Sequence, residues 1–307
     1  MDKESKIILI SGPTASGKSN FSIKIAKKFN GEIINADSMQ VYKNLKFLTA
    51  RPLKKDQGNI KHHLYGVIDL DKNFSTGQWL EIAIKKIKAV RKRKKIPILV
   101  GGTGLYFQSL IDGLVKIPEI PVKFRNKIRQ LQKKDGQKKF YKKLLKIDPK
   151  VKDKILPTDS QRAQRAYEVM IKTKKSLFDW ASNTQSDFVD YDIRKIFIDI
   201  PREELLKRIL KRTEMMFKKK CIDEVKKFNI LKLNKLLSAN KLIGVQEITS
   251  YLKKLITLDQ CKELINIKTR QYAKRQNTWA RGHMTNWNNL YSKDLSILFK
   301  KTLKVIS

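Results

Sequence analysis

Residues 11–19, SGPTASGKS, decide the fold of the N-terminal part of this chain. Gly12, Gly17, Lys18 and Ser19 match the spacing G-x-x-x-x-G-K-S/T of a phosphate-binding loop. An apolar run at residues 6–10 predicts a buried strand before the loop, and residues 18–29 have the periodicity of an amphipathic helix after it. Because strand and helix flank the glycines in the required order, the motif predicts a polyphosphate site and not a chance glycine-rich turn.

The residue types of this loop suit an anion that is bound with Mg²⁺. Glycines allow successive backbone N–H groups to turn toward one point, and a helix N-terminus adds partial positive charge there. Lys18 adds a full charge, and the Ser19 hydroxyl is the expected Mg²⁺ ligand. Whether ATP also binds at the loop stays open. The expected phosphate-binding residues of the loop are Gly12, Pro13, Thr14, Ala15, Ser16, Gly17, Lys18 and Ser19.

Strand and helix patterns alternate through the first hundred residues. Residues 32–36 and 96–100 predict further strands, and residues 76–95 predict a helix between them. The alternating run at 193–200 returns to the sheet, and everything after residue 201 is expected to be helical, with a break near 239–244. The fold class is therefore α/β, with a P-loop NTPase-like core built on a parallel sheet.

The segment from residue 118 to residue 189 differs in character from its surroundings. Residues 122–154 contain fourteen Lys or Arg against three acidic residues, with helical periodicity and no strand pattern. We expect residues 118–189 to form a helical, basic insertion domain, and residues 1–117 and 190–307 to form the core domain with C-terminal helices.

Composition limits the functions that are possible. The 307 residues carry a formal net charge of +39, from 68 Lys plus Arg against 29 Asp plus Glu. Such an excess attracts nucleic acid, although any single lysine could equally be solvated surface. No run approaches the roughly 18 apolar residues of a membrane span, and the N-terminus does not resemble a signal peptide, so we expect a cytoplasmic protein that does not bind membranes. Cys221 and Cys261 suggest neither a disulfide framework nor a zinc site.

Two further loops follow predicted strands and should reach the same edge of the sheet. Asp37 follows residues 32–36, where it could act as a base facing the phosphate loop or simply cap a turn. Thr103 lies in the glycine-rich turn GGTG at residues 101–104. An ordinary phosphate-loop nucleotidase would carry an acidic Mg²⁺ residue at the end of that strand, and its absence argues against an ATPase.

Six motifs in order resemble one known family, the tRNA dimethylallyltransferases, also called tRNA isopentenyltransferases. The resemblance covers nearly the whole chain and is closest to bacterial members, which lack a zinc-finger extension. The motifs are GPTASGKS (12–19), DSMQVYK (37–43), LVGGTGLY (99–106), DSQRAQRAYEV (159–169), LLKRILKRTEMM (205–216) and KTRQYAKRQNTWAR (268–281).

The resemblance implies prenyl transfer from dimethylallyl diphosphate to N6 of the adenine on the 3′ side of the anticodon, in tRNAs that read codons beginning with U. It implies Asp37 as the base, Thr103 close to the reacting groups, and Arg212 as the arginine that stabilises the leaving diphosphate. Arg208 shares a helix face with Arg212 and is expected to contact the same diphosphate. Mg²⁺ is the implied cofactor, the anticodon stem-loop of tRNA is the implied partner, and the family's architecture suggests a monomer.

The same resemblance implies which residues contact tRNA. On the last long helix, Tyr272, Gln276 and Trp279 lie on a different face from the basic residues. We interpret the two aromatic residues as core packing, with base stacking as the alternative. The implied tRNA-binding residues are Asp37, Ser38, Met39, Gln40, Thr103, Arg125, Gln161, Arg162, Ala163, Gln164, Arg165, Gly244, Gln246, Arg270, Lys274 and Arg281.

The chain departs from the family pattern at one stretch that bears on tRNA contact. After Gly244 the family usually has Tyr and then a basic residue, whereas this chain has Val245 and Gln246. Two other classes of function share some features. A small-molecule kinase would share the phosphate loop, and an RNA-binding protein without chemistry would share the charge.

Overall fold

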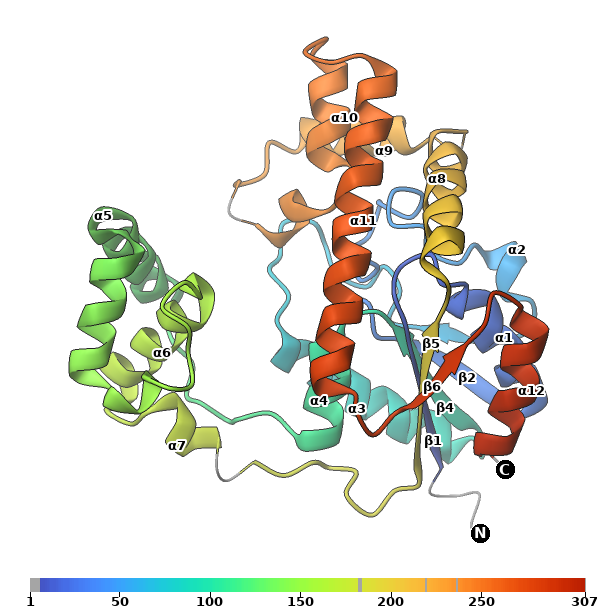
Figure 1. Cartoon of the computed structure of the whole chain (residues 1–307), viewed down its shortest axis with the longest axis horizontal. Coiled ribbons are helices and arrows are strands. Elements are labelled where there is room, and N and C mark those ends of the chain that lie inside the picture. Colours follow the sequence, from blue (N-terminus) through green and yellow to red (C-terminus); the bar gives the residue numbers. More distant parts are fainter. Residues whose placement is uncertain (1–5, 182–183, 219, 236, 307) are drawn as a thin grey trace. The chain divides into compact units, whose positions relative to one another are not determined.

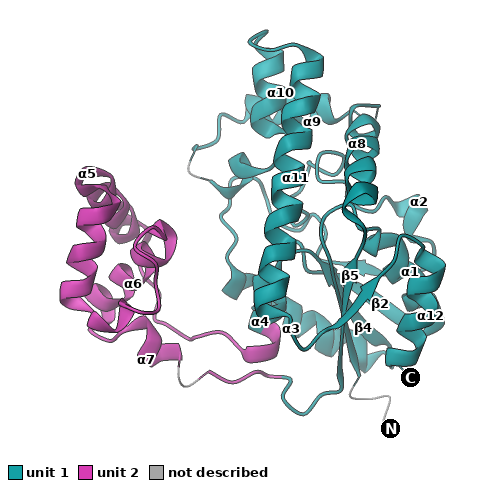
Figure 2. Cartoon of the chain, in the orientation of Figure 1, with its two compact units in different colours: residues 1–109, 188–307 teal, residues 110–187 magenta. Residues whose placement is uncertain are grey.

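The computed structural model describes residues 6–181, 184–218, 220–235 and 237–306 (Figure 1). The chain divides into two compact units (Figure 2). Unit 1 combines the residues up to Ser109 with those from Phe188 onward, and unit 2 is the segment Leu110–Asp187. The boundaries expected from composition, at 117/118 and 189/190, lie a few residues later in the chain.

Unit 1 is built on a six-stranded sheet in which every pairing is parallel. The strand order is β3-β2-β4-β1-β5-β6. This confirms the predicted α/β class with a parallel sheet, and it puts the carboxyl ends of all strands at one edge, where ligands bind in such folds. The strands are β1 Ile7–Ser11, β2 Gly31–Asn35, β3 His62–His63, β4 Ile96–Gly101, β5 Ile193–Asp199 and β6 Asn288–Tyr291.

Helices cover both faces of the sheet, which explains why β1 is buried at every position. Ile8 and Ile10 of β1 pack in one cluster with Phe21 of α1 (Lys18–Lys28) and Leu298 of α12 (Leu295–Ile306). Successive side chains of a strand point to opposite faces. Leu9 therefore faces the other side, where α3 (Thr76–Lys92) contacts β2 and β4.

A group of helices continues unit 1 beyond the sheet: α8 (Arg202–Lys218), α9 (Cys221–Ile230), α10 (Val245–Leu252) and α11 (Leu258–His283) (Figure 1). Their shared core is apolar and includes both cysteines, which are buried free thiols. The remaining elements of unit 1 are α2 (Lys54–Gln57), η2 (Ser238–Lys241) and α4 (Gly104–Asp112), which crosses into unit 2.

Unit 2 is helical, as predicted for the insertion. It contains α5 (Val122–Ile147), η1 (Pro149–Val151), α6 (Ser160–Thr173) and α7 (Leu177–Ala181). Gly136 interrupts α5 with a backbone φ of 72°. The core of this unit joins Phe140 and Leu144 of α5 to Ala163 and Ala166 of α6.

Two strands were missed because their sequences lack an apolar pattern. The prediction that everything after residue 201 is helical is wrong at β6, which pairs with β5 from Ile196↔Asn288 to Asp199↔Tyr291. Only Leu290 of β6 is buried, as suits a strand at the edge of a sheet. The other missed strand, β3, has two residues. Among the described residues, no helix is long and apolar enough to cross a membrane.

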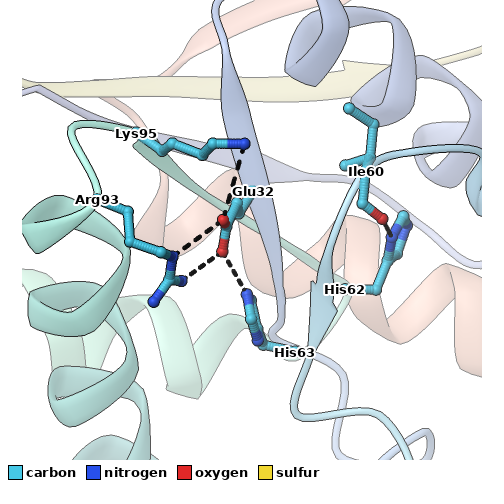
Figure 3. A network of polar contacts seen from close by, with 6 residues as sticks. All are labelled: Glu32, Ile60, His62, His63, Arg93 and Lys95. Atoms are coloured by element: carbon cyan, nitrogen blue, oxygen red, sulfur yellow. Dashed lines mark hydrogen bonds and ion pairs between the residues drawn. The ribbon is translucent and has the colours of Figure 1, made fainter.

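A buried carboxylate, that of Glu32, lies at the start of β2 (Figure 3). Because β2, β4 and β1 are parallel, this end of the strand is at the edge of the sheet opposite the phosphate loop. The Glu32 side chain is 1% exposed and accepts hydrogen bonds from Arg93 Nη2 at 2.5 Å and Nε at 3.2 Å. His63 Nε2 lies 2.7 Å from the carboxylate, and Lys95 Nζ lies 4.0 Å away. Burial alone would raise the pKa of Glu32, but the hydrogen bonds from Arg93 and His63 outweigh it and lower that pKa.

Candidate active site

The phosphate loop connects β1 to α1 and has the expected glycine geometry. Gly17 is the N-cap of α1 and has a φ of 90°, which residues with a side chain rarely adopt. Lys18, the first residue of α1, is 9% exposed, and its Nζ donates a hydrogen bond to the Pro13 carbonyl at 3.1 Å. Burial lowers the pKa of Lys18 from 10.5 to about 8, although the nearby Asp37 carboxylate opposes that shift.

The backbone of the loop corrects one detail of the predicted anion cradle. Pro13 has no N–H to donate, and its carbonyl instead accepts the Ser16 N–H at 3.2 Å. The Thr14 N–H donates to Gln276 Oε1 at 2.8 Å. Of the predicted loop residues, the backbone donors that remain as candidates for an anion are therefore those of Gly12, Ala15, Gly17, Lys18 and Ser19.

The two predicted arginines of α8 both border the loop but have different surroundings. Arg208 donates to the Ser16 carbonyl at 3.1 Å and to the Lys293 carbonyl at 2.9 Å, and Glu204 accepts from its Nε at 2.6 Å. Arg212 donates to the Thr14 hydroxyl, and its pKa is lowered by burial, with the Asp37 carboxylate opposing the shift. Arg208 thus holds the loop, whereas Arg212 lies between the loop and Asp37.

One pocket brings the phosphate loop and Asp37 together, and we call it the phosphate pocket. It combines cations, a carboxylate and a few apolar side chains, as a site for a phosphorylated apolar compound requires. The residues that line the phosphate pocket are Thr14, Ala15, Gly17, Lys18, Ser19, Asn20, Asp37, Gln40, Ala50, Tyr65, Val100, Gly101, Arg208 and Arg212.

A second, more apolar pocket adjoins the first. Thr14, Asp37, Gln40 and Arg212 line both pockets and therefore mark their junction. The other lining residues of the apolar pocket are Met39, Leu48, Thr49, Thr213, Met216, Leu242, Ile243, Ile265, Thr269 and Tyr272.

Asp37 and Thr103 lie in neighbouring loops at the ends of β2 and β4. The Asp37 side chain accepts the Met39 N–H at 2.9 Å, so it does cap a turn, yet the residue also borders both pockets. The Thr103 hydroxyl accepts the Ser38 N–H at 2.9 Å and donates to Ser38 Oγ at 3.1 Å. These bonds tie the two loops together next to Asp37.

The residues present fit a Mg²⁺ ion that is held partly by substrate. Ser19 borders the phosphate pocket together with Lys18 and Asp37. Among the described residues, no group of three or more His, Cys, Asp or Glu is placed to hold a metal. Mg²⁺ commonly takes only one or two protein ligands and completes its shell with phosphate oxygens and water. A single hydroxyl beside an anion site is therefore a suitable donor set.

Comparison with known proteins agrees with this geometry. A model of the IPP transferase family matches residues 40–283. The tRNA dimethylallyltransferase of Pelagibacter ubique (strain HTCC1062) is 64% identical over 304 residues, which cover 99% of this chain and 97% of that protein. The chain belongs to the IPP transferase family.

Solved structures of IPP transferases share the fold. The tRNA delta(2)-isopentenylpyrophosphate transferase of Staphylococcus epidermidis aligns with a TM-score of 0.69 at 32% identity, over 97% of this chain and 98% of that one. A eukaryotic dimethylallyltransferase that acts on tRNA aligns with a TM-score of 0.81 at 29% identity, over 95% of this chain and 75% of that one.

The predicted tRNA-binding residues of this IPP transferase fall in both units. In unit 1, Gln246, Lys274 and Arg281 are exposed, and Arg270 is paired with Glu263 at 2.8 Å. Gly244 is buried at the start of α10, where its N–H donates to Glu247 Oε2 at 2.8 Å. This glycine has a structural task that does not depend on RNA.

In unit 2 the predicted residues lie on α5 and α6. Gln161 and Arg162 are exposed, whereas Ala163 is fully buried in the core of the unit. The buried Glu168 carboxylate lies 3.4 Å from Arg125 Nε and 3.6 Å from Arg165 Nη1. Gln164 Nε2 donates to Gln132. The ion pairs hold both arginines on one side of unit 2.

Sequence reasoning missed two polar residues at the site. Tyr272 of α11 was interpreted as core packing and Gln276 was given no role, but Tyr272 borders the apolar pocket and, with Thr103, a neighbouring pocket. Gln276 contacts two loops of the site. The available signal was that both are polar residues at i and i+4, on one face of a helix within a family motif.

Proposed function

We propose that this chain is a tRNA dimethylallyltransferase. It transfers the dimethylallyl group from dimethylallyl diphosphate to N6 of the adenine on the 3′ side of the anticodon (tRNA position 37), in tRNAs that read codons beginning with U. The products are N6-isopentenyladenosine and diphosphate. The observation that carries the proposal is the carboxylate of Asp37 in the same pocket as the phosphate loop and Arg212.

The chemistry places most of the catalytic demand on the leaving group. Adenine N6 is a weak nucleophile, so the allylic carbon must gain cationic character as its bond to the diphosphate oxygen breaks. The electron pair of that bond leaves with the diphosphate, next to Lys18, Arg212 and the backbone donors of the loop. Mg²⁺ held by Ser19 would supply further positive charge to the diphosphate when it is bound.

Asp37 provides the other half of the reaction. As the new N6–carbon bond forms, the carboxylate accepts the N6 proton, which leaves a neutral secondary amine. Thr103 positions this region through its bonds to Ser38. The adenine must leave the anticodon stack to reach the pocket, at a cost of a few kcal/mol.

The remaining parts of the proposal concern the partners. The basic residues of unit 2 and of α11 would contact the phosphates of the anticodon stem-loop. We infer that the enzyme acts as a monomer in the cytoplasm and requires Mg²⁺.

The test is transfer of label from radiolabelled dimethylallyl diphosphate to tRNA in the presence of Mg²⁺. Label in the tRNA supports prenyl transfer. ATP consumption with a phosphorylated acceptor would support a kinase instead, and tRNA binding without transfer would support a protein that only binds RNA.

A pair of variants tests the role of Asp37. Asp37→Asn keeps an oxygen for the Met39 N–H but cannot take up the proton, and Asp37→Ala removes both functions. We expect both variants to bind tRNA within a few-fold of the parent while turnover falls by about 10² or more. Turnover of Asp37→Asn close to that of the parent would exclude Asp37 as the base.

A further inference from the structure

Gln276 joins the two loops that meet at the reaction centre. It lies on α11 and is 8% exposed. Its Oε1 accepts the Thr14 N–H of the phosphate loop at 2.8 Å, and its Nε2 donates to the carbonyl of Gly102 at 2.9 Å. Thr14 and Gly102 are 262 and 174 residues away in the chain, so one side chain connects three distant segments.

The chemistry of the partners fixes the orientation of this amide. A backbone N–H can only donate and a carbonyl can only accept, so only one of the two ways of placing the amide oxygen and nitrogen satisfies both. Neither a carboxylate nor an apolar side chain of similar size can make both bonds. The position therefore selects glutamine among residues of this shape.

Each loop that Gln276 holds carries one half of the proposed chemistry. On one side, the Thr14 hydroxyl accepts a hydrogen bond from Arg212, which faces the leaving diphosphate. On the other side, Gly102 precedes Thr103, whose hydroxyl holds the Ser38 N–H next to Asp37. The two halves are thus connected by hydrogen bonds and short covalent segments of the two loops, and this connection passes through the Gln276 amide.

The space around the Gly102 end of this connection is closed. A Cβ atom built on Gly102 would lie 2.1 Å from Gln276 Nε2, which is far inside a van der Waals contact. A side chain at position 102 would therefore displace the amide.

We propose that Gln276 is a positioning residue for prenyl transfer, which sets the spacing between the loop that holds the leaving diphosphate and the loop that carries the base. The inference rests on the proposed function. It assigns the residue no contact with either substrate, so its loss should affect the reaction step more than donor binding. A misplacement of about 1 Å between reacting groups can cost on the order of 10² in rate.

The first test compares Gln276→Met with the parent and with Gln271→Met, an exposed glutamine of the same helix. We expect Gln276→Met to lose about 10- to 100-fold in kcat while its KM for dimethylallyl diphosphate stays within about threefold. Gln271→Met should match the parent in both constants. A folded Gln276→Met with kcat within twofold of the parent would overturn the proposal.

Gln276→Glu provides a second readout that a merely structural role would not change. A protonated carboxyl group can accept from Thr14 and donate to Gly102, whereas a carboxylate can only accept. We expect the kcat of this variant, divided by that of the parent at the same pH, to be highest at the lowest pH and to decline as the pH rises. A ratio that does not change with pH contradicts the proposal, even if Gln276→Met does not fold.

Gly102→Ala disturbs the hydrogen bond between Gln276 and Gly102 by a change in Gly102. We expect it to lower kcat by about the same factor, and the double variant with Gln276→Met to be no slower than the slower single variant, because both changes break one connection. Gly282→Ala, where a Cβ meets nothing within 4 Å, is the control. Multiplicative losses in the double variant would refute a shared connection. If the parent transfers no label to tRNA, the proposed function fails, whereas an active parent with unaffected variants overturns only the role of Gln276.

Discussion

At the scale of single residues, Lys18 makes the strongest prediction because its environment changes when an anion binds. Its pKa is about 8 in the structure, so a large fraction is neutral at pH 8 to 9. A diphosphate beside it favours the charged form, so binding in this range should take up a proton and affinity should fall as the pH rises through 8. Calorimetry of inorganic pyrophosphate binding in buffers of different ionisation enthalpy measures the uptake. Lys18→Arg, which stays protonated, is the control.

The lowered pKa of Lys18 also determines how the free energy of unfolding depends on pH. Between pH 8 and 10.5 the unfolded chain binds more protons at this lysine than the folded chain does. The contribution of Lys18 to the free energy of unfolding therefore rises with pH in this range and is lowest below pH 8.

In the calorimetric test of pyrophosphate binding, proton uptake by Lys18→Arg equal to that of the parent would show that another group titrates.

A site residue could be predicted from the sequence when the features that identify it are close to it along the chain. The phosphate loop was predictable because its spacing, its strand and its helix are contiguous. Asp37 and Thr103 were predictable as ends of strands. Gln276 was not, because its partners lie 262 and 174 residues away and no pattern along one helix identifies them.

At the scale of elements, the Glu32 network connects β2, β3 and the segment before β4 (Figure 3). Replacing Glu32 by Gln removes a buried charge that is paired with Arg93 and Lys95 and hydrogen-bonded to His63, and we expect the free energy of unfolding to fall by about 1 to 3 kcal/mol at pH 7. Thermal unfolding followed by circular dichroism reports the change. Glu81→Gln, which breaks an exposed pair with Lys85, should leave the melting temperature close to that of the parent.

Acid should remove the difference between Glu32→Gln and the parent. The folded-state pKa of Glu32 is lowered, so its stabilising contribution is present above about 4.5 and is lost as the pH falls through the folded pKa. A difference in melting temperature that persists unchanged at strongly acidic pH would argue against the ionic origin of the effect.

Strands with a recognisable pattern of apolar residues could be predicted from the sequence. Strands that form only because a neighbouring strand is available for pairing could not. β1 and β4 are apolar runs, β2 contains two adjacent isoleucines and β5 alternates, and the predicted bounds of these four strands agree with the structure to within one residue. β6 reads NNLY and forms a strand because β5 offers it a free edge. Only the assembled sheet provides that edge.

At the scale of the whole molecule, the charge of +39 predicts how tRNA binding responds to salt. Each phosphate contact that is neutralised by a Lys or Arg contributes about 0.7 to 0.9 to the slope of log affinity against log salt concentration. Arg125→Ala in unit 2 should reduce that slope by about one and leave kcat at saturating tRNA unchanged. Filter binding across a series of salt concentrations measures it.

The matched control for Arg125 is Lys300→Ala, an exposed lysine on α12. We expect it to leave the salt slope as it is in the parent. Equal slopes for Arg125→Ala and the parent would remove Arg125 from the RNA contacts and leave its ion pair with Glu168 as its role.

The order of strands in the sheet has a consequence for synthesis on the ribosome. β1 lies between β4 and β5. Residues 7–11 therefore cannot pair with β5 until the ribosome has added more than 180 further residues. Unit 2 is contiguous and is complete before β5 emerges, so it can fold first. The half-built sheet meanwhile exposes the edge of β1, and a nascent chain that stalls in this interval offers that edge to chaperones or to other nascent chains.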